Sequence, residues 1–280
     1  MKKVLAILLA LAMVFSFAAC GAKEEANVPE TNDNPLGVIN PGKLTVATSP
    51  DFAPYEFYVA DAAGNYQLAG FDVAIAGYIA DYLGLELDII PMDFDGCLAE
   101  LAAKNVDIAL AGLSPDPERM DKMDFSDIYY LGGQSFCVAK NNENLFANLE
   151  ATNDAQYAIG AQNGSIQVDL AEKNSPNADI VKLTKVTDII AELLSGSLDG
   201  AYIETAVAET YAISYPDLVV KFDVPYDVAG SAVGVVKDNA ALLAGVNEAI
   251  AKALSDGSMD SFVAKANEDS LGNIFEGLLQ

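Results

Sequence analysis

The sequence predicts an α/β protein of two lobes, each built on a mostly parallel sheet flanked by helices. Two observations predict this class. Short apolar runs alternate with segments of helical periodicity, and the alternation starts again near residue 156 after a first series that ends near residue 112. A few residues join the two series, so we expect the lobes to touch. Ligands of open α/β sheets lie at the carboxyl ends of strands, which predicts a ligand cleft between the lobes.

The first series reads strand, helix, strand, helix, strand. A run of apolar residues at helical spacing ends at Gly84, a typical helix stop, and Asp95 is placed to cap the second helix. The expected strands are residues 43–48, 85–91 and 106–112, and the expected helices are residues 70–84 and 95–105.

The second series repeats this order without a convincing sequence repeat. Thr187 is expected to cap a helix that stops at Gly196. The expected strands are residues 156–161, 178–183, 198–203 and 230–237, and the expected helices are residues 165–174, 187–196, 205–213 and 239–257.

Charge and composition exclude several function classes. The formal net charge is −26, which repels nucleic-acid phosphates and anionic lipid headgroups, so we expect no nucleic-acid partner. The chain has no histidine, which excludes hydrolases that use a Ser-His-Asp or Cys-His constellation and removes the commonest zinc ligand. Chemistry based on carboxylates or lysine stays open, and we expect neither a metal nor a cofactor.

The first residues predict export. Lys2 and Lys3 precede an apolar run too short to span a bilayer comfortably, which is typical of a signal peptide over residues 1–19. The stretch FAAC resembles a bacterial lipoprotein cleavage site, with Cys20 as the lipidated residue; the alternative is an ordinary secretory signal with a chance cysteine. Residues 20–42 are polar and rich in Pro, Gly and Asn, which predicts a flexible lipidated tether before a body that starts near Lys43.

Two further cysteines, Cys97 and Cys137, lie in apolar segments where buried free thiols are ordinary. An exported chain can also form a disulfide, and spacing alone does not decide between the two.

Arg119 is the only arginine in a chain that has fourteen lysines. Asp116 and Pro117 predict the start of a helix, which places Arg119 in the first turn, at the end where a cation is unfavourable. The planar guanidinium binds a carboxylate or phosphate through two donors at once, which lysine does not do. The alternative is a plain salt bridge with Asp116 or another nearby acid.

The order of several segments resembles the polar amino acid family of bacterial extracellular solute-binding proteins (family 3), the receptors of ABC importers. These segments are TSPDFAPYEF, GFDVAIAGYIADYLG and MDFDGCLAELAAKNVDIALAGLSPDPERMDKMDFSDIYY, and the resemblance covers about residues 43–270. It implies a two-lobed fold of the periplasmic-binding-protein type II. It also implies lobe boundaries at 43–132 plus 231–280 for one lobe and 133–230 for the other, with closure on the ligand between them.

The resemblance also implies which residues bind the carboxylate of an amino acid. Arg119 stands at the position of the carboxylate clamp, and Ser114 would donate its backbone N–H to the same group. Ser165 and the N–H of Ile166, in the stretch AQNGSIQ, would begin a helix whose positive end faces the carboxylate. Asp116 departs from the usual threonine, which removes one hydroxyl from this end.

Other positions would receive the ammonium group and the side chain. The carbonyl of Gly112 and the acid Glu204, longer than the commoner aspartate, would accept from the α-ammonium. Phe52 and Phe94 would wall the substrate, and Ser49 replaces an acid found in receptors for basic amino acids. Taken singly, these residues could equally be core aromatics or helix caps.

The resemblance therefore implies a monomeric, lipid-anchored receptor on the outer face of the cytoplasmic membrane, which delivers a free, neutral or polar amino acid to an ABC permease. The alternative is a cyclohexadienyl dehydratase-like lyase on the same fold, with Glu204 as the general acid. A ligand sensor for a separate membrane partner is a third possibility.

Overall fold

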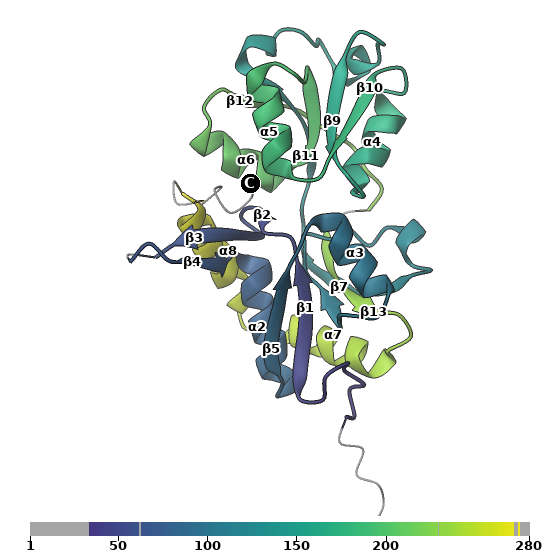
Figure 1. Cartoon of the computed structure of the whole chain (residues 1–280), viewed down its shortest axis with the longest axis vertical. Coiled ribbons are helices and arrows are strands. Elements are labelled where there is room, and N and C mark those ends of the chain that lie inside the picture. Colours follow the sequence, from purple (N-terminus) through teal and green to yellow (C-terminus); the bar gives the residue numbers. More distant parts are fainter. Residues whose placement is uncertain (1–33, 62, 229, 272–273, 275–280) are drawn as a thin grey trace, which may run out of the picture. The chain divides into compact units, whose positions relative to one another are not determined.

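The structure is a computed structural model that describes residues 34–61, 63–228, 230–271 and 274. The predicted signal peptide, the lipidation site Cys20 and residues 20–33 of the predicted tether lie outside these residues. Within them the predicted α/β class is confirmed, with two five-stranded sheets and their helices (Figure 1). We call the elements around the first sheet lobe 1 and those around the second sheet lobe 2.

The sheet of lobe 1 has the strand order β5-β1-β6-β13-β7. Strand β1 pairs in parallel with β5 and β6, whereas β13 runs antiparallel to both β6 and β7, so one strand of the five is reversed. The strands are β1 (Lys43–Thr48), β5 (Glu86–Pro91), β6 (Ile108–Ala109), β7 (Met123–Tyr130) and β13 (Ser231–Val236).

Helices and a small hairpin sheet complete lobe 1. The antiparallel sheet β2-β3-β4 follows β1 and was not predicted, because its strands are short and its second half is polar. Its strands are β2 (Asp51–Phe52), β3 (Glu56–Ala60) and β4 (Tyr66–Ala69), and the helices are α2 (Phe71–Leu83), α3 (Phe94–Ala102), α7 (Ala240–Ser255) and α8 (Ser258–Ser270).

The sheet of lobe 2 repeats this arrangement in the order β10-β9-β11-β8-β12, with β8 as the reversed strand. Its strands are β8 (Gln134–Ala139), β9 (Ala158–Gln162), β10 (Asp179–Leu183), β11 (Gly200–Glu204) and β12 (Leu218–Asp223). Its helices are α4 (Ile166–Asn174), α5 (Val186–Ser195) and α6 (Thr205–Ser214), and short 3-10 turns lie at η2 (Lys140–Asn142) and η3 (Leu149–Thr152).

The chain crosses between the sheets twice. It passes from β7 in lobe 1 to β8 in lobe 2 through residues 131–133, and it returns from β12 to β13 through residues 224–230. Both reversed strands therefore follow a crossover directly.

The folded body begins before Lys43. Val38 is buried, and the N–H of Ile39 donates to Oδ1 of Asp107 at 2.8 Å. The side chain of Asn239 donates to the carbonyl of Leu36 at 2.9 Å. The contacts hold residues 34–42 against lobe 1, so the expected flexible tether does not extend to residue 42.

Three predicted boundaries were wrong. Helix α3 begins at Phe94 after Asp93, not after Asp95, and α5 begins at Val186 after Lys185, so Thr187 lies inside the helix. Strand β6 keeps only Ile108–Ala109 of the expected residues 106–112, because the chain turns away at Gly112 with a φ of 57°. The predicted stops at Gly84 and Gly196 are confirmed, both in the left-handed conformation.

The lobes share buried surface. One cluster of buried hydrophobic side chains has members in both lobes, and a second cluster lies within lobe 2. Cys97 in lobe 1 and Cys137 in lobe 2 are both buried free thiols, so no disulfide joins them. Over the described residues, no helix combines the length and the apolar character that crossing a membrane requires.

Candidate ligand-binding site

Arg119 lies where lobe 1 meets lobe 2. Its Nη1 donates to the carbonyl of Ser114 at 3.2 Å, and its Nη2 donates across to the carbonyl of Gly164 in lobe 2 at 3.0 Å. Its Cζ lies 5.7 Å from the centroid of the Phe94 ring, a cation–π distance. The guanidinium is thus held in place by two neutral carbonyls and an aromatic face.

The local chain explains this position. Asp116 caps the turn as predicted, accepting from the N–H of Glu118 at 2.8 Å, but the turn is the short 3-10 segment η1 (Pro117–Arg119) rather than an α-helix. No ion pair of the described residues involves Arg119, so the predicted alternative of a salt bridge with Asp116 is wrong. Burial lowers the pKa of Arg119, and the more distant acids Asp116 and Asp169 oppose that shift.

Gly112 and Ser114 follow β6 and lie against an aromatic wall. A Cβ on Gly112 would lie 2.7 Å from Cε1 of Phe52, so only glycine allows the ring to approach this backbone. The N–H of Gly112 donates to Oδ2 of Asp72 at 2.9 Å, and Ser114 is buried. The rings of Phe52 and Tyr55 lie 5.3 Å apart, which extends the wall toward lobe 2.

Two buried acids, Asp72 and Glu56, lie behind Gly112, and Asp72 is the one that bonds to its N–H. Asp72 accepts from the hydroxyl of Tyr129 at 2.7 Å, and burial raises its pKa to about 6. Glu56 is fully buried beside Asp72, and burial together with the Asp72 charge raises the pKa of Glu56 well above its usual range. Burial therefore favours the neutral form of Glu56 over the ionised form next to Asp72.

Glu204 is buried at the end of β11, where it caps α6. Its Oε2 accepts from the N–H of Val207 at 2.9 Å, and its Oε1 accepts from the N–H of Gly133 at 3.3 Å. Burial raises its pKa to about 7, and these donors together with the hydroxyl of Tyr55 limit the rise. A buried acid that titrates near neutrality at a lobe boundary is typical of functional sites.

Ser165 and Ile166 are buried at the start of α4. The Ser165 hydroxyl donates to the carbonyl of Gln162 at 2.7 Å and accepts from the N–H of Gln167 at 3.2 Å. The hydroxyl is thus a helix cap, and the N–H of Ser165 itself donates to the carbonyl of Gln162 at 3.2 Å, so a ligand at the positive end of α4 would meet the N–H of Ile166.

Ser49 is buried, and its hydroxyl donates to Oδ1 of Asp51 at 2.8 Å. Asp51 was missed by the sequence analysis, although it follows β1 within the segment that supplied Ser49 and Phe52. Oδ2 of Asp51 accepts from two groups of lobe 2, the N–H of Val186 at 2.7 Å and Nε2 of Gln162 at 3.2 Å. Burial raises the pKa of Asp51 to about 6, and the donors oppose the rise.

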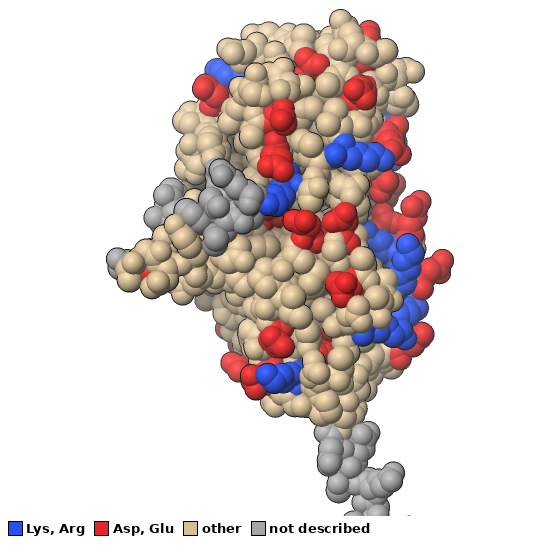
Figure 2. All heavy atoms as spheres, in the orientation of Figure 1, with Lys and Arg blue, Asp and Glu red and all other residues tan. Residues whose placement is uncertain are grey.

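Charged side chains on the surface are mixed. Acidic and basic groups are interspersed on the face shown in Figure 2, which therefore offers no continuous basic surface for a phosphate backbone. Among the residues that the structure describes, no group of three or more Cys, Asp or Glu side chains is arranged to hold a metal ion.

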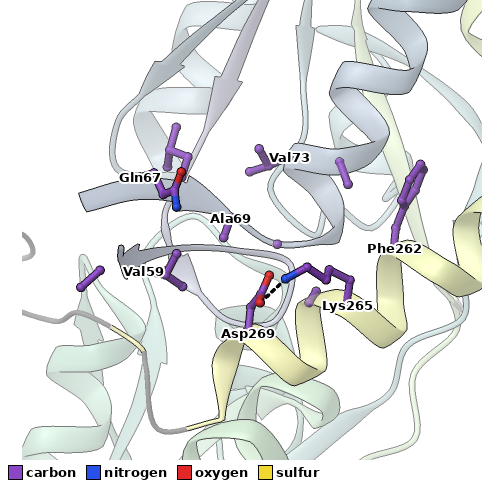
Figure 3. A pocket seen from close by; sticks show the side chains of 12 residues that line it. Val59, Gln67, Ala69, Val73, Phe262, Lys265 and Asp269 are labelled. Atoms are coloured by element: carbon purple, nitrogen blue, oxygen red, sulfur yellow. Dashed lines mark hydrogen bonds and ion pairs between the residues drawn. The ribbon is translucent and has the colours of Figure 1, made fainter. Parts of the chain in front are cut away.

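A separate hollow of about 500 Å³ lies on lobe 1, between the β3–β4 hairpin and helix α8. Figure 3 shows its lining, with Val59, Gln67 and Ala69 on one side and Phe262 and the Lys265–Asp269 ion pair on the other. None of the predicted ligand-binding residues lines it.

Comparison with known proteins identifies relatives over most of the chain. The family described as bacterial extracellular solute-binding proteins, family 3, matches residues 44–268. The arginine-binding extracellular protein ArtP of Bacillus subtilis (strain 168) is 32% identical over 244 residues, which are 85% of this chain and 88% of ArtP.

A solved structure agrees with this match. The amino acid ABC transporter substrate-binding protein AbpA from Streptococcus pneumoniae Canada MDR_19A, bound to L-arginine, has a TM-score of 0.78 and 33% identity, and the match covers 82% of this chain and 96% of that one. The cyclohexadienyl dehydratase of Pseudomonas aeruginosa PAO1 is 26% identical over 204 residues, which are 72% of this chain and 75% of the dehydratase.

Proposed function

Because this chain belongs to family 3 of the bacterial extracellular solute-binding proteins, we propose that it binds a free amino acid between its lobes and delivers it to the permease of an ABC importer. In this function it is a receptor rather than an enzyme, and it releases its ligand chemically unchanged. Closure of the lobes around the ligand produces the form that the permease binds.

One observation carries the proposal. The only arginine of a chain with 41 acids lies at the meeting of the lobes, and no described carboxylate forms an ion pair with it. Two of its five N–H donors bond to carbonyls, one in each lobe, which leaves donors for an anion. A ligand carboxylate supplies the missing negative charge in the geometry that a guanidinium binds best.

The other predicted residues complete a site for a zwitterion. The N–H groups of Ser114 and Ile166 would add to the carboxylate end, with Ser165 at the start of the same helix. Glu204 and the carbonyl of Gly112 would accept from the α-ammonium, and Phe52 and Phe94 would enclose the carbon skeleton. Tyr55 connects the two ends, because its ring packs on Phe52 and its hydroxyl bonds to Glu204.

The membrane attachment belongs to the same proposal. A lipid on Cys20, after removal of residues 1–19, would tether a monomer to the outer face of the cytoplasmic membrane beside its permease. Globomycin treatment of expressing cells, with Cys20→Ala as the control, would test this attachment by the size and membrane association of the chain.

We propose a neutral or polar side chain for the ligand. Ser49 carries no charge, and Asp51 beside it already accepts hydrogen bonds from Ser49, Gln162 and Val186. A cationic side chain is the second candidate, because the negative charge of Asp51 has no ion-pair partner among the described residues and because ArtP and AbpA are named for arginine.

Calorimetric titration of the body (residues 34–280) against the twenty amino acids and cystine tests the proposal. We expect one chemical group of amino acids to bind at micromolar affinity or better, and Arg119→Lys to weaken it by at least about tenfold, the scale of one charge-assisted hydrogen bond. Lys122→Ala, which removes an exposed cation from the same segment, is the matched control. Absence of binding to all of them would contradict the proposal.

Turnover distinguishes the lyase alternative, which the similarity to cyclohexadienyl dehydratase favours. Mass spectrometry of cyclohexadienyl substrates after incubation with the protein would detect any loss of water, and a receptor returns every ligand with its mass unchanged.

A further inference from the structure

Helix α5 of lobe 2 begins without a cap of its own. Lys185 occupies the N-cap position, and its side chain makes no capping hydrogen bond. The first N–H groups of a helix need acceptors, and serine, threonine, asparagine or aspartate usually supplies one. Here Oδ2 of Asp51, from lobe 1, accepts from the N–H of Val186 at 2.7 Å, so the cap comes from the other lobe.

Asp51 makes further bonds to lobe 2. Nε2 of Gln162 donates to the same oxygen at 3.2 Å, and the hydroxyl of Tyr211 donates to the backbone carbonyl of Asp51 at 3.2 Å. Asp51 is 3% exposed, and no ion pair of the described chain includes it. A buried acid without a cation is tolerated here because the donors and the positive end of α5 all face it.

We infer that Asp51 is the positioning residue that fastens lobe 2 onto lobe 1, by capping α5 only when the lobes are closed. This inference rests on the proposed function in one respect, namely that the lobes open and close. On opening, Asp51 loses its three partners in lobe 2, and α5 loses its cap. On closing, all of these bonds form in a place from which water is excluded, where they are strongest.

In this arrangement Ser49 orients the carboxylate of Asp51. Its hydroxyl bonds to Oδ1 and leaves Oδ2 directed at Val186 and Gln162. Ser49 therefore supports the cap and does not need to contact the ligand.

A contact on the surface provides a contrast. Nδ2 of Asn163 in lobe 2 donates to Oδ2 of Asp95 in lobe 1 at 2.8 Å, and both side chains are solvated. An exposed contact of this kind contributes little to closure, because water competes for both partners. It does mark two positions, one on each lobe, that are in contact in this structure.

Cross-linking at these positions measures closure without any ligand. In the body with Asp95→Cys and Asn163→Cys, the rate of disulfide formation under a fixed oxidant reports the closed fraction, while Cys97 and Cys137 are buried. We expect Asp51→Ala to slow this rate at least about tenfold, the scale expected for losing hydrogen bonds to a charged acceptor, and Asp51→Asn to give a smaller reduction.

Two controls make the result specific. Asp93→Asn removes a nearby exposed charge that makes no capping bond, and we expect a change of less than about twofold. Lys185→Ser gives α5 a cap of its own, and added to Asp51→Ala it should restore thermal stability but not the cross-linking rate. An unchanged rate in both Asp51 variants, or an equal loss with Asp93→Asn, would overturn the inference.

The same experiment separates this inference from the proposed function. If the protein binds no amino acid but Asp51→Ala slows the cross-linking, the inference about Asp51 stands and the proposed receptor function fails. If the protein binds an amino acid but cross-links at the same rate with and without the Asp51 side chain, the receptor function stands and the inference about Asp51 fails.

Discussion

The binding of a zwitterion should depend on pH through Glu204. Burial raises the pKa of this acid to about 7 in the ligand-free protein, so about half of the molecules carry it neutral at neutral pH. The α-ammonium of an amino acid attracts the ionised form only, and binding would therefore lower the pKa of Glu204 and release a proton.

The size of the effect follows from that pKa. At pH 8 about nine-tenths of Glu204 is ionised, and at pH 5 about one-hundredth is, so affinity should fall about a hundredfold between these values, or roughly 2.7 kcal/mol. The fall begins below pH 7, and affinity should be nearly constant above pH 8 until the ammonium group of the ligand itself titrates.

Calorimetric titration at pH 5, 6, 7 and 8, in buffers of different ionisation enthalpy, measures both the affinity and the protons released. The ligand is the amino acid that binds most tightly in the panel. Glu204→Gln is the matched variant, since its amide oxygen can still accept from Val207, and it should bind more weakly with a flatter pH profile. A wild-type affinity that is constant from pH 5 to 8, or an equal slope in Glu204→Gln, would refute this reasoning.

Three other predictions follow from buried groups. The free energy of unfolding should fall by a few kcal/mol between pH 5 and pH 8, because the folded pKa values of Asp51 and Asp72, about 6, exceed those of the unfolded chain. Thermal unfolding in a pH series measures this fall. Gly200→Ala should destabilise lobe 2 by several kcal/mol in urea unfolding, since its Cβ would lie 2.1 Å from Cζ of Phe136. The comparison is Gly196→Ala, at a left-handed position with open space around it, which should cost about 1 kcal/mol. Burial raises the pKa of both Cys97 and Cys137, so a thiol reagent should label neither in the native body and both after unfolding.

Periodicity and composition predicted most of the fold. Apolar spacing identified α2 and α7, and the left-handed stops at Gly84 and Gly196 were predicted because only glycine is comfortable in that conformation. The β2–β3–β4 sheet was missed because its strands have two to five residues and carry no alternating pattern. The predicted cap positions at α3 and α5 were both wrong, and at α5 the first N–H group has its acceptor outside the local sequence.

The first residue of α5 could not be predicted from the sequence around it. Thr187 is the better cap by residue type, yet the helix begins at Val186 because Asp51, 135 residues earlier in the chain, supplies the acceptor. For the same reason Asp51 could not be singled out from the local sequence. Its partners become visible only when the two lobes are placed together.

The buried acids give the fold and the proposed site opposite responses to pH. Protonation of Asp51, Asp72 and Glu204 stabilises the folded chain, because each is buried with too few donors to keep its usual pKa. Ligand binding requires the opposite form of Glu204. A chain selected for stability alone would replace such groups with apolar residues, since burying a charge costs more than its hydrogen bonds return. The proposed ligand and lobe closure account for Glu204 and Asp51, which lie where the lobes meet, whereas Asp72 lies in the first turn of α2 and holds Gly112 and Tyr129 within lobe 1.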